Sequence, residues 1–600
     1  MNDTENAIRK IHGNDKEQLD IIFSKEKRII VEAAAGCGKT KTLVSKLAYL
    51  LSTHSIPNNK KVLALTFGVN AAYKIKKEVF EKIPVLMSTT DKDLEKKILV
   101  TNFHGLARRI LRNYGYILHV NLLRINEFNV VDDGKAETLT KLDIGILENE
   151  AMFMSNYSLW IKANNIHEIK KNYNKYIDII ISKFLPNKHI TYNAILMLAL
   201  KILCSNDEVL LFYQKFFPYI IIDEFQDTGF FSWILLQRLI ATDTYLLFMG
   251  DPLQRIYGFI GAIPNLMEEA QKQYSMKQFK ISTNYRFKNN QDMLLLDQNI
   301  RKNSISDFAS ITDDATVPVY LCDTQYKEAL YVVKKLQFLL RKDENKIAIL
   351  VQSRINNLNL KFILDTLSEN SIPYFNGLFS EESSSYKKFH QDVLDIFISC
   401  YKNSKYKSIN KSILTKVYSS IQSLYEGKTD DEINSLMKLL EVFFTHITTD
   451  KLFLSNDEKY MLIVDVLSNN ALKQSMEYLD ENIIVTTVHS AKGLEWDYVI
   501  MPDMERNSFP NYMSLCSSCS ELSNNSTCKA CCLDDKTKSL DKYIEVLSLF
   551  YVAVTRARKQ VFFSGSLESI NDVRYPNTKY SCLLSLPGIK LIQDTILSID

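Results

Sequence analysis

The segment RIIVEAAAGCGKT (28–40) decides the fold that this sequence predicts. Its apolar first half is typical of a strand that is covered on both faces of a parallel sheet. Its second half is a turn of small residues ending in Gly-Lys-Thr, which matches the phosphate-binding P-loop pattern except that Ala33 replaces the first glycine. Gly36 and Gly38 allow backbone N–H groups to turn toward phosphate oxygens. We therefore predict a strand, a phosphate-binding turn and a helix in direct succession.

The polar end of this segment carries the chemistry of a nucleotide site. We expect Lys39 to neutralise the β- and γ-phosphates and the Thr40 hydroxyl to ligate Mg²⁺. The alternative is a turn of small residues that precedes a buried helix and binds nothing. The predicted phosphate contacts are Ala35, Gly36, Cys37, Gly38, Lys39, Thr40 and Lys41.

A second apolar strand, within FPYIIIDEFQDT (217–228), carries two acids where it ends. Asp223 suits a Mg²⁺ contact, and Glu224 suits a general base that deprotonates the attacking water. An acid pair at this position could instead cap a helix. Because each segment supplies what the other lacks, the two together favour ATP hydrolysis. Arg286 and Arg556 are candidates to stabilise the charge that develops on the γ-phosphate.

Further apolar runs predict more buried strands, and helix-compatible stretches separate them. This alternation predicts a doubly wound α/β fold with parallel sheets. The chain becomes helical at 102–190 and again at 381–480, so we predict two α/β domains, each with a helical insertion. The additional strand segments are KVLALTF (61–67), KIAILVQS (346–353), NIIVTTVHS (482–490) and DYVIMPD (497–503).

Composition limits the class of protein. Six hundred residues are too many for one core, and 46% hydrophobic with 24% charged residues is ordinary for a soluble protein. The net charge of +3 neither demands nor excludes a nucleic-acid partner. We find no membrane-spanning run and no signal peptide, and we expect a cytoplasmic protein that binds no membrane.

Five of the ten cysteines lie between Cys516 and Cys532, and the other five are scattered. Two C-x-x-C pairs in a short segment are typical of a structural zinc site with four thiolate ligands. The alternative is a Ser/Asn-rich loop with unligated thiols. The predicted zinc ligands are Cys516, Cys519, Cys528 and Cys531, within a zinc loop at 516–532.

Nine short segments resemble, in order, the motif series of the UvrD/Rep/PcrA-like group of superfamily 1 DNA helicases. The segments span nearly the whole chain, and DEFQD, GDPLQRIYGFIGA and HSAKGLEW are the most specific of them. They are NDKEQLDII (14–22), AAAGCGKT (33–40), TFGVNAAYKI (66–75), TNFHGLARRIL (101–111), DEFQD (223–227), GDPLQRIYGFIGA (250–262), NYRF (284–287), TVHSAKGLEWDYV (487–499) and YVAVTRA (551–557).

The resemblance implies two RecA-like P-loop domains and assigns further residues to ATP. It places Gln18 and Tyr285 on the adenine and Glu495 on the ribose. It places Arg286 and Gln254 at the γ-phosphate, with Arg556 as the arginine finger. The implied domain ranges are 1–101, 191–284, 285–380 and 481–600 for the two RecA-like domains, with insertions at 102–190 and 381–480.

The resemblance also implies contacts with single-stranded DNA. Aromatic rings stack on any base, so a grip of this kind tolerates every sequence. The alternative for each ring is core packing, which for Phe103 is at least as good an interpretation. The implied DNA contacts are Phe67, His104, Tyr257, Phe259 and His489.

The sequence departs from the family pattern outside the catalytic residues. Gly68-Val69-Asn70 replaces Thr-Asn-Lys, Phe259-Ile260 replaces Trp-Arg, and Leu547-Ser548 replaces a frequent arginine pair. The second insertion is also shorter than usual. These departures leave the ATP chemistry intact and bear on DNA contacts and unwinding.

The function that we expect is therefore 3′-to-5′ movement on single-stranded DNA, driven by ATP with Mg²⁺. The partners would be single-stranded and tailed duplex DNA, in repair, recombination or phage defence. One alternative is the motor subunit of a helicase–nuclease complex, with the nuclease on another chain. A second alternative is a DNA-binding regulator that uses ATP only as a switch.

Overall fold

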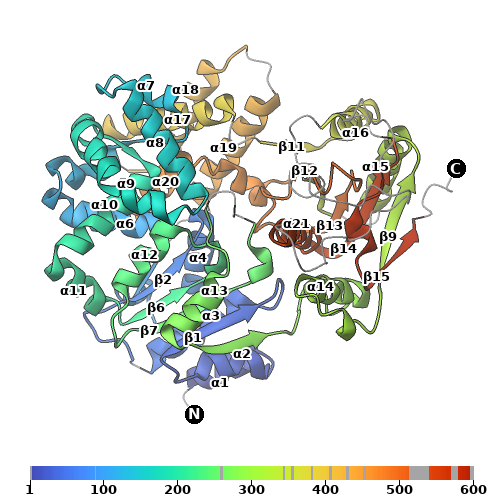
Figure 1. Cartoon of the computed structure of the whole chain (residues 1–600), viewed down its shortest axis with the longest axis horizontal. Helices are drawn as coiled ribbons and strands as arrows, with labels where there is room; N and C mark the ends of the chain where they lie inside the picture. Colours follow the sequence, from blue (N-terminus) through green and yellow to red (C-terminus); the bar gives the residue numbers. More distant parts are fainter. Residues whose placement is uncertain are drawn as a thin grey trace. The chain divides into compact units, whose positions relative to one another are not determined.

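The computed structural model describes most of the 600-residue chain, which divides into two compact units, Met1–Thr283 and Asn284–Asp600. Figure 1 shows the course of the chain through both units. The described residues are 3–53, 55–87, 89–256, 258, 261–341, 345–352, 357–379, 383–404, 408–427, 431–449, 454–511, 539–568 and 579–594.

The first unit is built on a six-stranded sheet in which all neighbouring strands are parallel. The carboxyl ends of parallel strands meet at one edge of a sheet, which is where ligands bind in folds of this kind. In spatial order the strands are β3 (Ile98–Asn102), β2 (Val62–Thr66), β6 (Tyr219–Ile222), β7 (Tyr245–Gly250), β1 (Arg28–Ala33) and β8 (Lys277–Ile281).

The apolar runs that predict these strands are explained by burial on both faces. Successive side chains point to opposite faces of a sheet, so a strand with two covered faces is apolar at successive positions along its buried part. In β1, Ile29 and Val31 belong to one hydrophobic cluster and Ile30 belongs to the other. In β7, Phe248 and Met249 divide between the two clusters in the same way.

Helices cover each face of the first sheet (Figure 1). Residues of α3 (Lys39–Ser52) and α4 (Val69–Leu86) complete the cluster on one face. Residues of α6 (Phe103–Tyr114), α10 (Tyr192–Ser205) and α12 (Phe230–Leu239) complete the other. The P-loop helix is therefore anchored in a core on its inner side.

The connection from β3 to β6 is mainly helical. Besides α6 and α10 it contains α8 (Glu148–Lys162), α9 (Ile166–Ile179) and α11 (Asp207–Phe216). It also contains a small parallel pair, β4 (Asn129–Val131) with β5 (His189–Thr191).

The second unit contains a seven-stranded sheet whose neighbouring strands are again all parallel. In spatial order the strands are β11 (Phe375–Gly377), β12 (Ile483–Thr487), β10 (Ile347–Val351), β13 (Trp496–Met501), β14 (Ala557–Ser566), β9 (Ala315–Cys322) and β15 (Ile589–Gln593).

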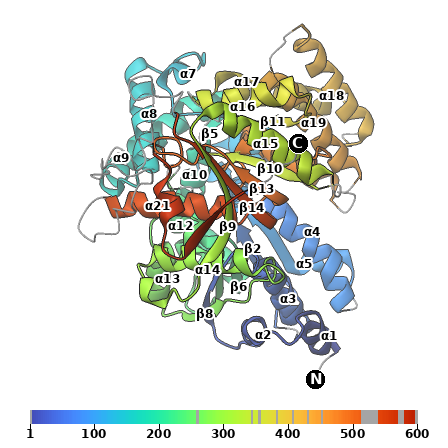
Figure 2. The same ribbon diagram turned by 90° about the vertical axis from the view of Figure 1, so that its right-hand side faces the viewer.

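Helices also cover this sheet (Figure 2). Residues of α15 (Gln325–Leu340) and α16 (Leu358–Glu369) pack in one cluster with strand residues such as Ile349 and Val485. From α21 (Ser539–Val554), Phe550 packs on Phe563 of β14, with ring centroids 5.6 Å apart. The predicted order of strands and helices is thus present in both units.

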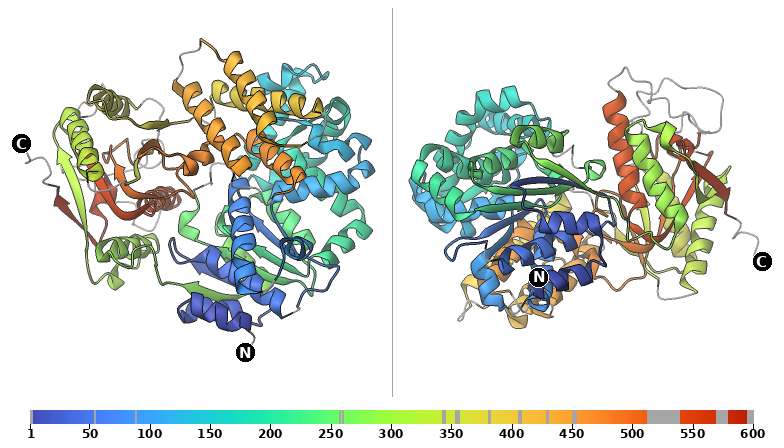
Figure 3. Two further views of the ribbon diagram at one scale, coloured as in Figure 1. Left: turned by 180° about the vertical axis from the view of Figure 1, so that it is seen from behind. Right: turned by 90° about the horizontal axis from the view of Figure 1, so that it is seen from below.

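The connection from β11 to β12 is helical, and its helices appear in yellow to orange in Figure 3. They pack on one another through buried side chains such as Phe397, Leu440 and Val464. The helices are α17 (Ser384–Lys402), α18 (Lys411–Leu424), α19 (Asp431–Thr449) and α20 (Asn456–Ser468).

The predicted fold class is confirmed, because two α/β units with parallel sheets each carry a helical connection. The predicted zinc ligands Cys516, Cys519, Cys528 and Cys531 lie outside the described residues. Within the part of the chain that the structure describes, no helix has the length and apolar character needed to cross a membrane.

Candidate functional site

The P-loop joins the carboxyl end of β1 to the first residue of α3. Gly36 and Gly38 lie in the left-handed region, at φ 76° and φ 80°, where a side chain would strain the backbone. A Cβ on Gly38 would also approach the Gln18 amide nitrogen to 2.9 Å. Both glycines are therefore required by the turn itself.

Lys39 opens α3 and lies beside the acids of the neighbouring strands. Its Nζ is 3.3 Å from Oε1 of Glu224. Burial alone would lower the pKa of Lys39, but the carboxylates of Glu224, Asp251 and Asp223 outweigh burial and raise it. Lys39 is therefore a fixed positive charge at the mouth of the loop.

Asp223 and Glu224 follow β6, at the carboxyl edge of the sheet. The backbone N–H of Asp223 donates to Leu65 O at 2.9 Å, which extends the pairing of β6 with β2 by one residue. Burial, with repulsion by Glu224, raises the pKa of Asp223 to about 7, while Lys39 opposes the rise. A nearby cation stabilises the ionised form of a buried carboxylate such as this one. The surroundings of Asp223 therefore fit its expected role as a Mg²⁺ ligand.

A chain of hydrogen bonds connects Glu224 with Gln254. The Gln226 amide donates to Oε2 of Glu224 at 2.5 Å, and its oxygen accepts from the backbone N–H of Asp251 at 3.0 Å. The Gln254 amide then donates to Oδ2 of Asp251 at 2.8 Å. The proposed base and the proposed γ-phosphate sensor thus belong to one network. The motifs DEFQD and GDP contain Gln226 and Asp251, but neither residue was predicted to belong to the site.

Gln18 contacts the P-loop through its amide. Its Nε2 donates to Cys37 O at 2.9 Å, and its Oε1 is hydrogen-bonded to Nδ1 of His12. The other ring nitrogen of His12 lies 2.8 Å from Oγ of Ser45 in α3. Burial lowers the pKa of His12, so the ring is held neutral between two partners. His12 was missed because a single histidine before a helix carries no motif signal.

The remaining P-loop positions have different surroundings. Ala35 and Cys37 are buried, and the Cys37 side chain belongs to a hydrophobic cluster. Thr40 lies in the first turn of α3 and is half-buried. Lys41 Nζ donates to Ile11 O at 2.6 Å, which holds this side chain on the N-terminal helices.

The second unit gathers its own charged residues around Glu495. The Arg286 guanidinium donates both to Glu495 and to the carbonyl of Thr555. Arg558 Nε donates to Oε2 of Glu495 at 3.2 Å. Burial would raise the pKa of Glu495, but Arg286, Arg556 and Arg558 outweigh it and lower the pKa. Arg558 was missed, although it lies two residues after the predicted arginine finger.

Arg556 is held by the backbone of this unit. It is 4% exposed, and it donates to Val552 O at 3.0 Å and to Leu494 O at 3.1 Å. Tyr285, predicted to stack on adenine, is 41% exposed. The structure therefore brings Arg286, Glu495 and Arg556 together and leaves the Tyr285 ring accessible.

The predicted DNA contacts divide into three groups. Phe67 and His489 are half-buried. The His104 ring stacks on Tyr192, with centroids 3.6 Å apart, and burial lowers its pKa to about 3, so it is a neutral aromatic surface. Tyr257 and Phe259 lie outside the described residues.

Phe103 is 3% exposed and belongs to the hydrophobic core of the first unit, which agrees with the core-packing alternative for this ring.

The residues of the first unit fit ATP with Mg²⁺ on their geometry. The turn presents backbone at Gly36 and Gly38, and the Lys39 ammonium lies close to two acids. Lys39 would hold the terminal phosphates, while Thr40 and Asp223 would hold the metal ion.

Comparison with known proteins gives matches over most of the chain. The UvrD/REP helicase N-terminal domain profile matches residues 14–275, and the UvrD-like helicase C-terminal domain profile matches residues 379–568.

Curated relatives are similar along most of their length. A probable DNA helicase II homolog of Mycoplasma capricolum is 22% identical over 91% of this chain and 83% of its own. DNA helicase II of Rickettsia typhi is 24% identical over 92% of both chains. The ATP-dependent DNA helicase PcrA of Leuconostoc citreum is 22% identical over 93% of this chain and 82% of its own.

Proposed function

The chain belongs to the UvrD/Rep family of DNA helicases, and on this premise we propose that it moves 3′-to-5′ along single-stranded DNA and couples ATP hydrolysis to strand separation. The observation that carries the proposal is the cluster of Lys39, Asp223 and Glu224 beside a turn that presents its backbone. This cluster contains a phosphate ligand, a metal ligand and a base.

Hydrolysis assigns a task to each of these side chains. Bound ATP with Mg²⁺ supplies the phosphoanhydride bond and the metal that neutralises its charge. Lys39 binds the β- and γ-phosphates, and Glu224 accepts a proton from the attacking water. Gln254 responds to the γ-phosphate through the network that reaches Glu224 by way of Gln226 and Asp251.

For four residues of the second unit we propose the nucleotide roles that the family resemblance implies. Tyr285 stacks on the adenine and Glu495 binds the ribose. Arg286 and Arg556 stabilise the charge that develops on the γ-phosphate. The backbone carbonyls that hold Arg556 orient its guanidinium, so that little freedom is lost when it binds phosphate.

In this proposal the DNA strand is contacted by five ring-bearing side chains. They are Phe67, His104, Tyr257, Phe259 and His489. Stacking on a base contributes about 1–3 kcal/mol and does not depend on sequence. A motor with such contacts acts on single-stranded and tailed duplex DNA in repair, recombination or phage defence. A nuclease on a separate chain is a fitting partner, and the reducing cytoplasm is the compartment that suits the scattered cysteines.

Zinc in the Cys516–Cys532 segment remains a proposal from the sequence alone. Four thiolates close the coordination sphere of the metal, so the ion is structural. Metal analysis of purified wild type beside a Cys516→Ser/Cys519→Ser variant tests it. About one zinc per chain is expected in the wild type and none in the variant. A folded, active wild type that is free of metal, prepared without chelators, would leave only an unligated loop.

Unwinding assays on 3′-tailed duplexes, 5′-tailed duplexes and RNA test the main proposal. We expect ATP-dependent unwinding of the 3′-tailed DNA alone. Lys39→Ala is the matched inactive variant, because it removes the phosphate charge and no core packing, while Lys77→Ala removes a surface lysine of α4. Equal unwinding of 5′-tailed DNA would overturn the polarity, and DNA-stimulated ATPase in Lys39→Ala would overturn the site.

A further inference from the structure

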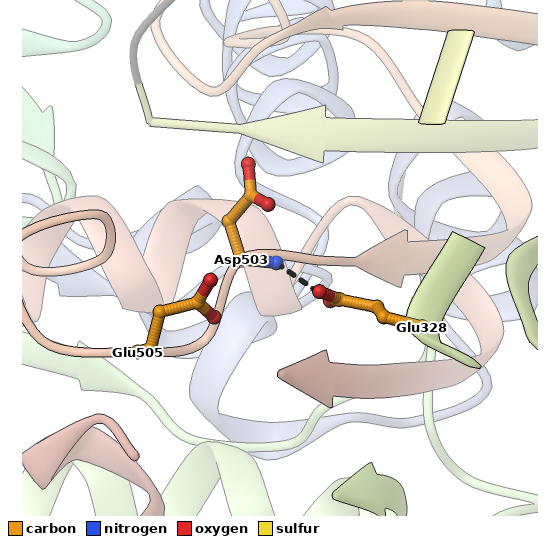
Figure 4. Close-up of side chains that lie close together, drawn as sticks. All are labelled: Glu328, Asp503 and Glu505. Atoms are coloured by element: carbon orange, nitrogen blue, oxygen red, sulfur yellow. Dashed lines mark hydrogen bonds between the residues drawn. The ribbon is translucent and has the colours of Figure 1, made fainter. Parts of the chain in front are cut away.

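Three buried acids of the second unit take no part in the nucleotide chemistry proposed above. Glu328 lies in the first turns of α15, and Asp503 and Glu505 follow β13 at the carboxyl edge of the sheet. In Figure 4 the carboxylates of Glu328 and Glu505 point toward each other, the Asp503 backbone nitrogen lies beside Glu328, and the Asp503 carboxylate points away from both. One oxygen from each acid lies within 4.8 Å of the other two.

Each carboxylate accepts well-formed hydrogen bonds on one oxygen only, although the Gln325 side chain and the Ser566 N–H also lie near Glu328 and Glu505, respectively, and act to lower their pKa. Ser564 Oγ and the Asp503 backbone N–H donate to Oε1 of Glu328, at 2.8 and 3.0 Å. Asn357 donates to Oδ2 of Asp503 at 2.9 Å, and Asn359 donates to Oε1 of Glu505 at 2.8 Å. The buried oxygens Glu328 Oε2, Asp503 Oδ1 and Glu505 Oε2 have no hydrogen-bond partner.

These unsatisfied oxygens point to a missing ligand. Glu328 and Glu505 are 0% exposed and Asp503 is 2% exposed, so bulk water does not solvate them. Among the described residues, no lysine or arginine forms an ion pair with any of the three. A buried polar atom without a partner is costly, and three in one place require a common explanation.

The charge of the cluster agrees with this reasoning. Burial, with repulsion by Asp503, raises the pKa of Glu328 to about 8, and burial raises the pKa of Asp503 to about 6. The pKa of Glu505 is raised well above its usual value by burial and by both neighbours. The three groups therefore need protons or a cation to remain buried together.

We propose that Glu328, Asp503 and Glu505 bind a hard divalent cation, and that Ca²⁺ suits the site better than Mg²⁺. Ca²⁺ binds oxygen ligands at about 2.3–2.6 Å in flexible geometry, whereas Mg²⁺ requires a near-ideal octahedron at about 2.0–2.1 Å. A span of up to 4.8 Å between ligand atoms matches the longer bonds. Backbone carbonyls and water would complete the coordination sphere.

The side-chain amides of Asn357 and Asn359 are placed as residues that orient metal-binding carboxylates usually are. A metal-binding carboxylate commonly accepts a hydrogen bond on the oxygen that does not ligate the ion, which fixes its direction. Asn357 caps α16, Asn359 lies within α16, and Glu328 lies on α15. A bound cation would therefore fasten the segment after β13 to two helices on the same sheet. The ion would be structural rather than catalytic.

Titration of Ca²⁺ into the nucleotide-free full chain, dialysed against Ca²⁺-free buffer without chelators so that any zinc is retained, tests the site. We expect about one Ca²⁺ per chain and a Tm that rises with the logarithm of free Ca²⁺. Mg²⁺ and Mn²⁺ are tested in parallel, with weaker binding expected for Mg²⁺. Thiols bind Ca²⁺ poorly, so the cysteine segment does not interfere.

The variants Glu328→Gln and Glu505→Gln should lose both the binding and the Tm shift. Glutamine has the shape of the protonated acid, so the variants fold if shape alone matters. Asp323→Asn, an exposed acid at the start of α15, and Asp223→Asn, in the nucleotide site, should keep the binding. Unchanged Ca²⁺ binding in the two glutamine variants would overturn the assignment. A wild type that binds none of the three cations would also overturn it, even if every variant failed to fold.

Discussion

Glu224 occupies a backbone conformation that glutamate rarely adopts, at φ 51°, between the Lys39 ammonium and the Gln226 amide. Strain of this kind persists where the surrounding structure fixes a functional group. We predict that Glu224→Gln binds Mg-ATP and hydrolyses it about 10²–10⁴-fold more slowly, because the amide cannot accept a proton. Single-turnover hydrolysis beside equilibrium binding of ATP measures both quantities.

The measurements on Glu224→Gln distinguish a general base from a ligand of the metal or the loop. If the variant loses nucleotide affinity in proportion to its rate, Glu224 holds the metal or the loop and is not the base. Glu81→Gln, on the surface of α4, is the matched control and should leave both quantities unchanged.

His12 positions Gln18 in this structure and does not contact the loop by its own ring. We predict that His12→Ala raises the KM for ATP about 2- to 10-fold and changes kcat less, because Gln18 loses the hydrogen bond that positions its amide. The KM for GTP should change less than the KM for ATP if Gln18 reads adenine. Equal changes for both nucleotides would show that His12 only stabilises the P-loop. Ser45→Ala, which removes the outer partner, should give a smaller effect in the same direction.

Among individual residues, the sequence predicts the charged side chains of the nucleotide motifs. It misses several residues that position those side chains. Lys39, Asp223 and Glu224 were assigned from the P-loop and the strand-end acids. His12 and Arg558 contact partners that are distant in the chain, whereas Gln226 lies within DEFQD, beside Glu224, and was still missed. The carboxylates of Glu328 and Glu505 are 177 positions apart, and only the fold brings them together.

Among the elements, α17 contains a buried group that should respond to acid. Nδ1 of His390 donates to Tyr386 O at 2.8 Å, and Nε2 accepts from the Leu472 N–H at 3.3 Å, so the ring is neutral. Burial, assisted by Lys473, lowers the pKa of His390 to about 4. Because the folded value lies below the unfolded one, the associated stability is full above about pH 6.5 and is lost as pH falls through 4.

We therefore predict that His390→Gln weakens the acid sensitivity of the protein between pH 6.5 and pH 4. The shift from 6.5 to about 4 corresponds to roughly 3 kcal/mol over this window. Chemical denaturation at pH 7 and pH 5 measures about 2 kcal/mol of this difference, because pH 5 lies about 1.5 units below the unfolded pKa. The exposed His167→Gln is the control and should behave as wild type. A pH dependence of His390→Gln equal to that of wild type would contradict the assignment.

Six strands with long apolar runs were predicted, whereas β7 (Tyr245–Gly250) was not, although its run is apolar and buried. β1, β2, β6, β10, β12 and β13 are buried on both faces, so their composition alone indicates strands. β4, β5 and β11 contain three residues each, too few for any periodicity. β8 and β15 lie at sheet edges with several exposed positions, and β15 has a helix-compatible sequence. Their strand state depends on their neighbours, which no local pattern records.

For the whole molecule, the sequence predicts two α/β units because the strand–helix alternation occurs twice. The units divide between Thr283 and Asn284. The order of the motifs identifies the family, and the roles expected for the ATP-site and DNA-contact residues follow from the family. Neither the motifs nor the family predicts the carboxylate cluster of the second unit, because Glu328, Asp503 and Glu505 belong to no nucleotide motif.

The strand order of the first sheet has a consequence for how the chain is made. β1 pairs only with β7 and β8, whose residues are synthesised more than 200 positions later. The strand that precedes the P-loop therefore has no strand partner until residues 245–250 are synthesised, and its second partner follows only at residues 277–281. Sheets that depend on such distant pairing fold slowly and expose apolar strands meanwhile. Pulse proteolysis of ribosome-arrested chains should show protection for residues 1–283 with a linker and none for residues 1–244. Early protection of the shorter chain would mean that β1 first finds a temporary partner, and that the native sheet is reached by exchange.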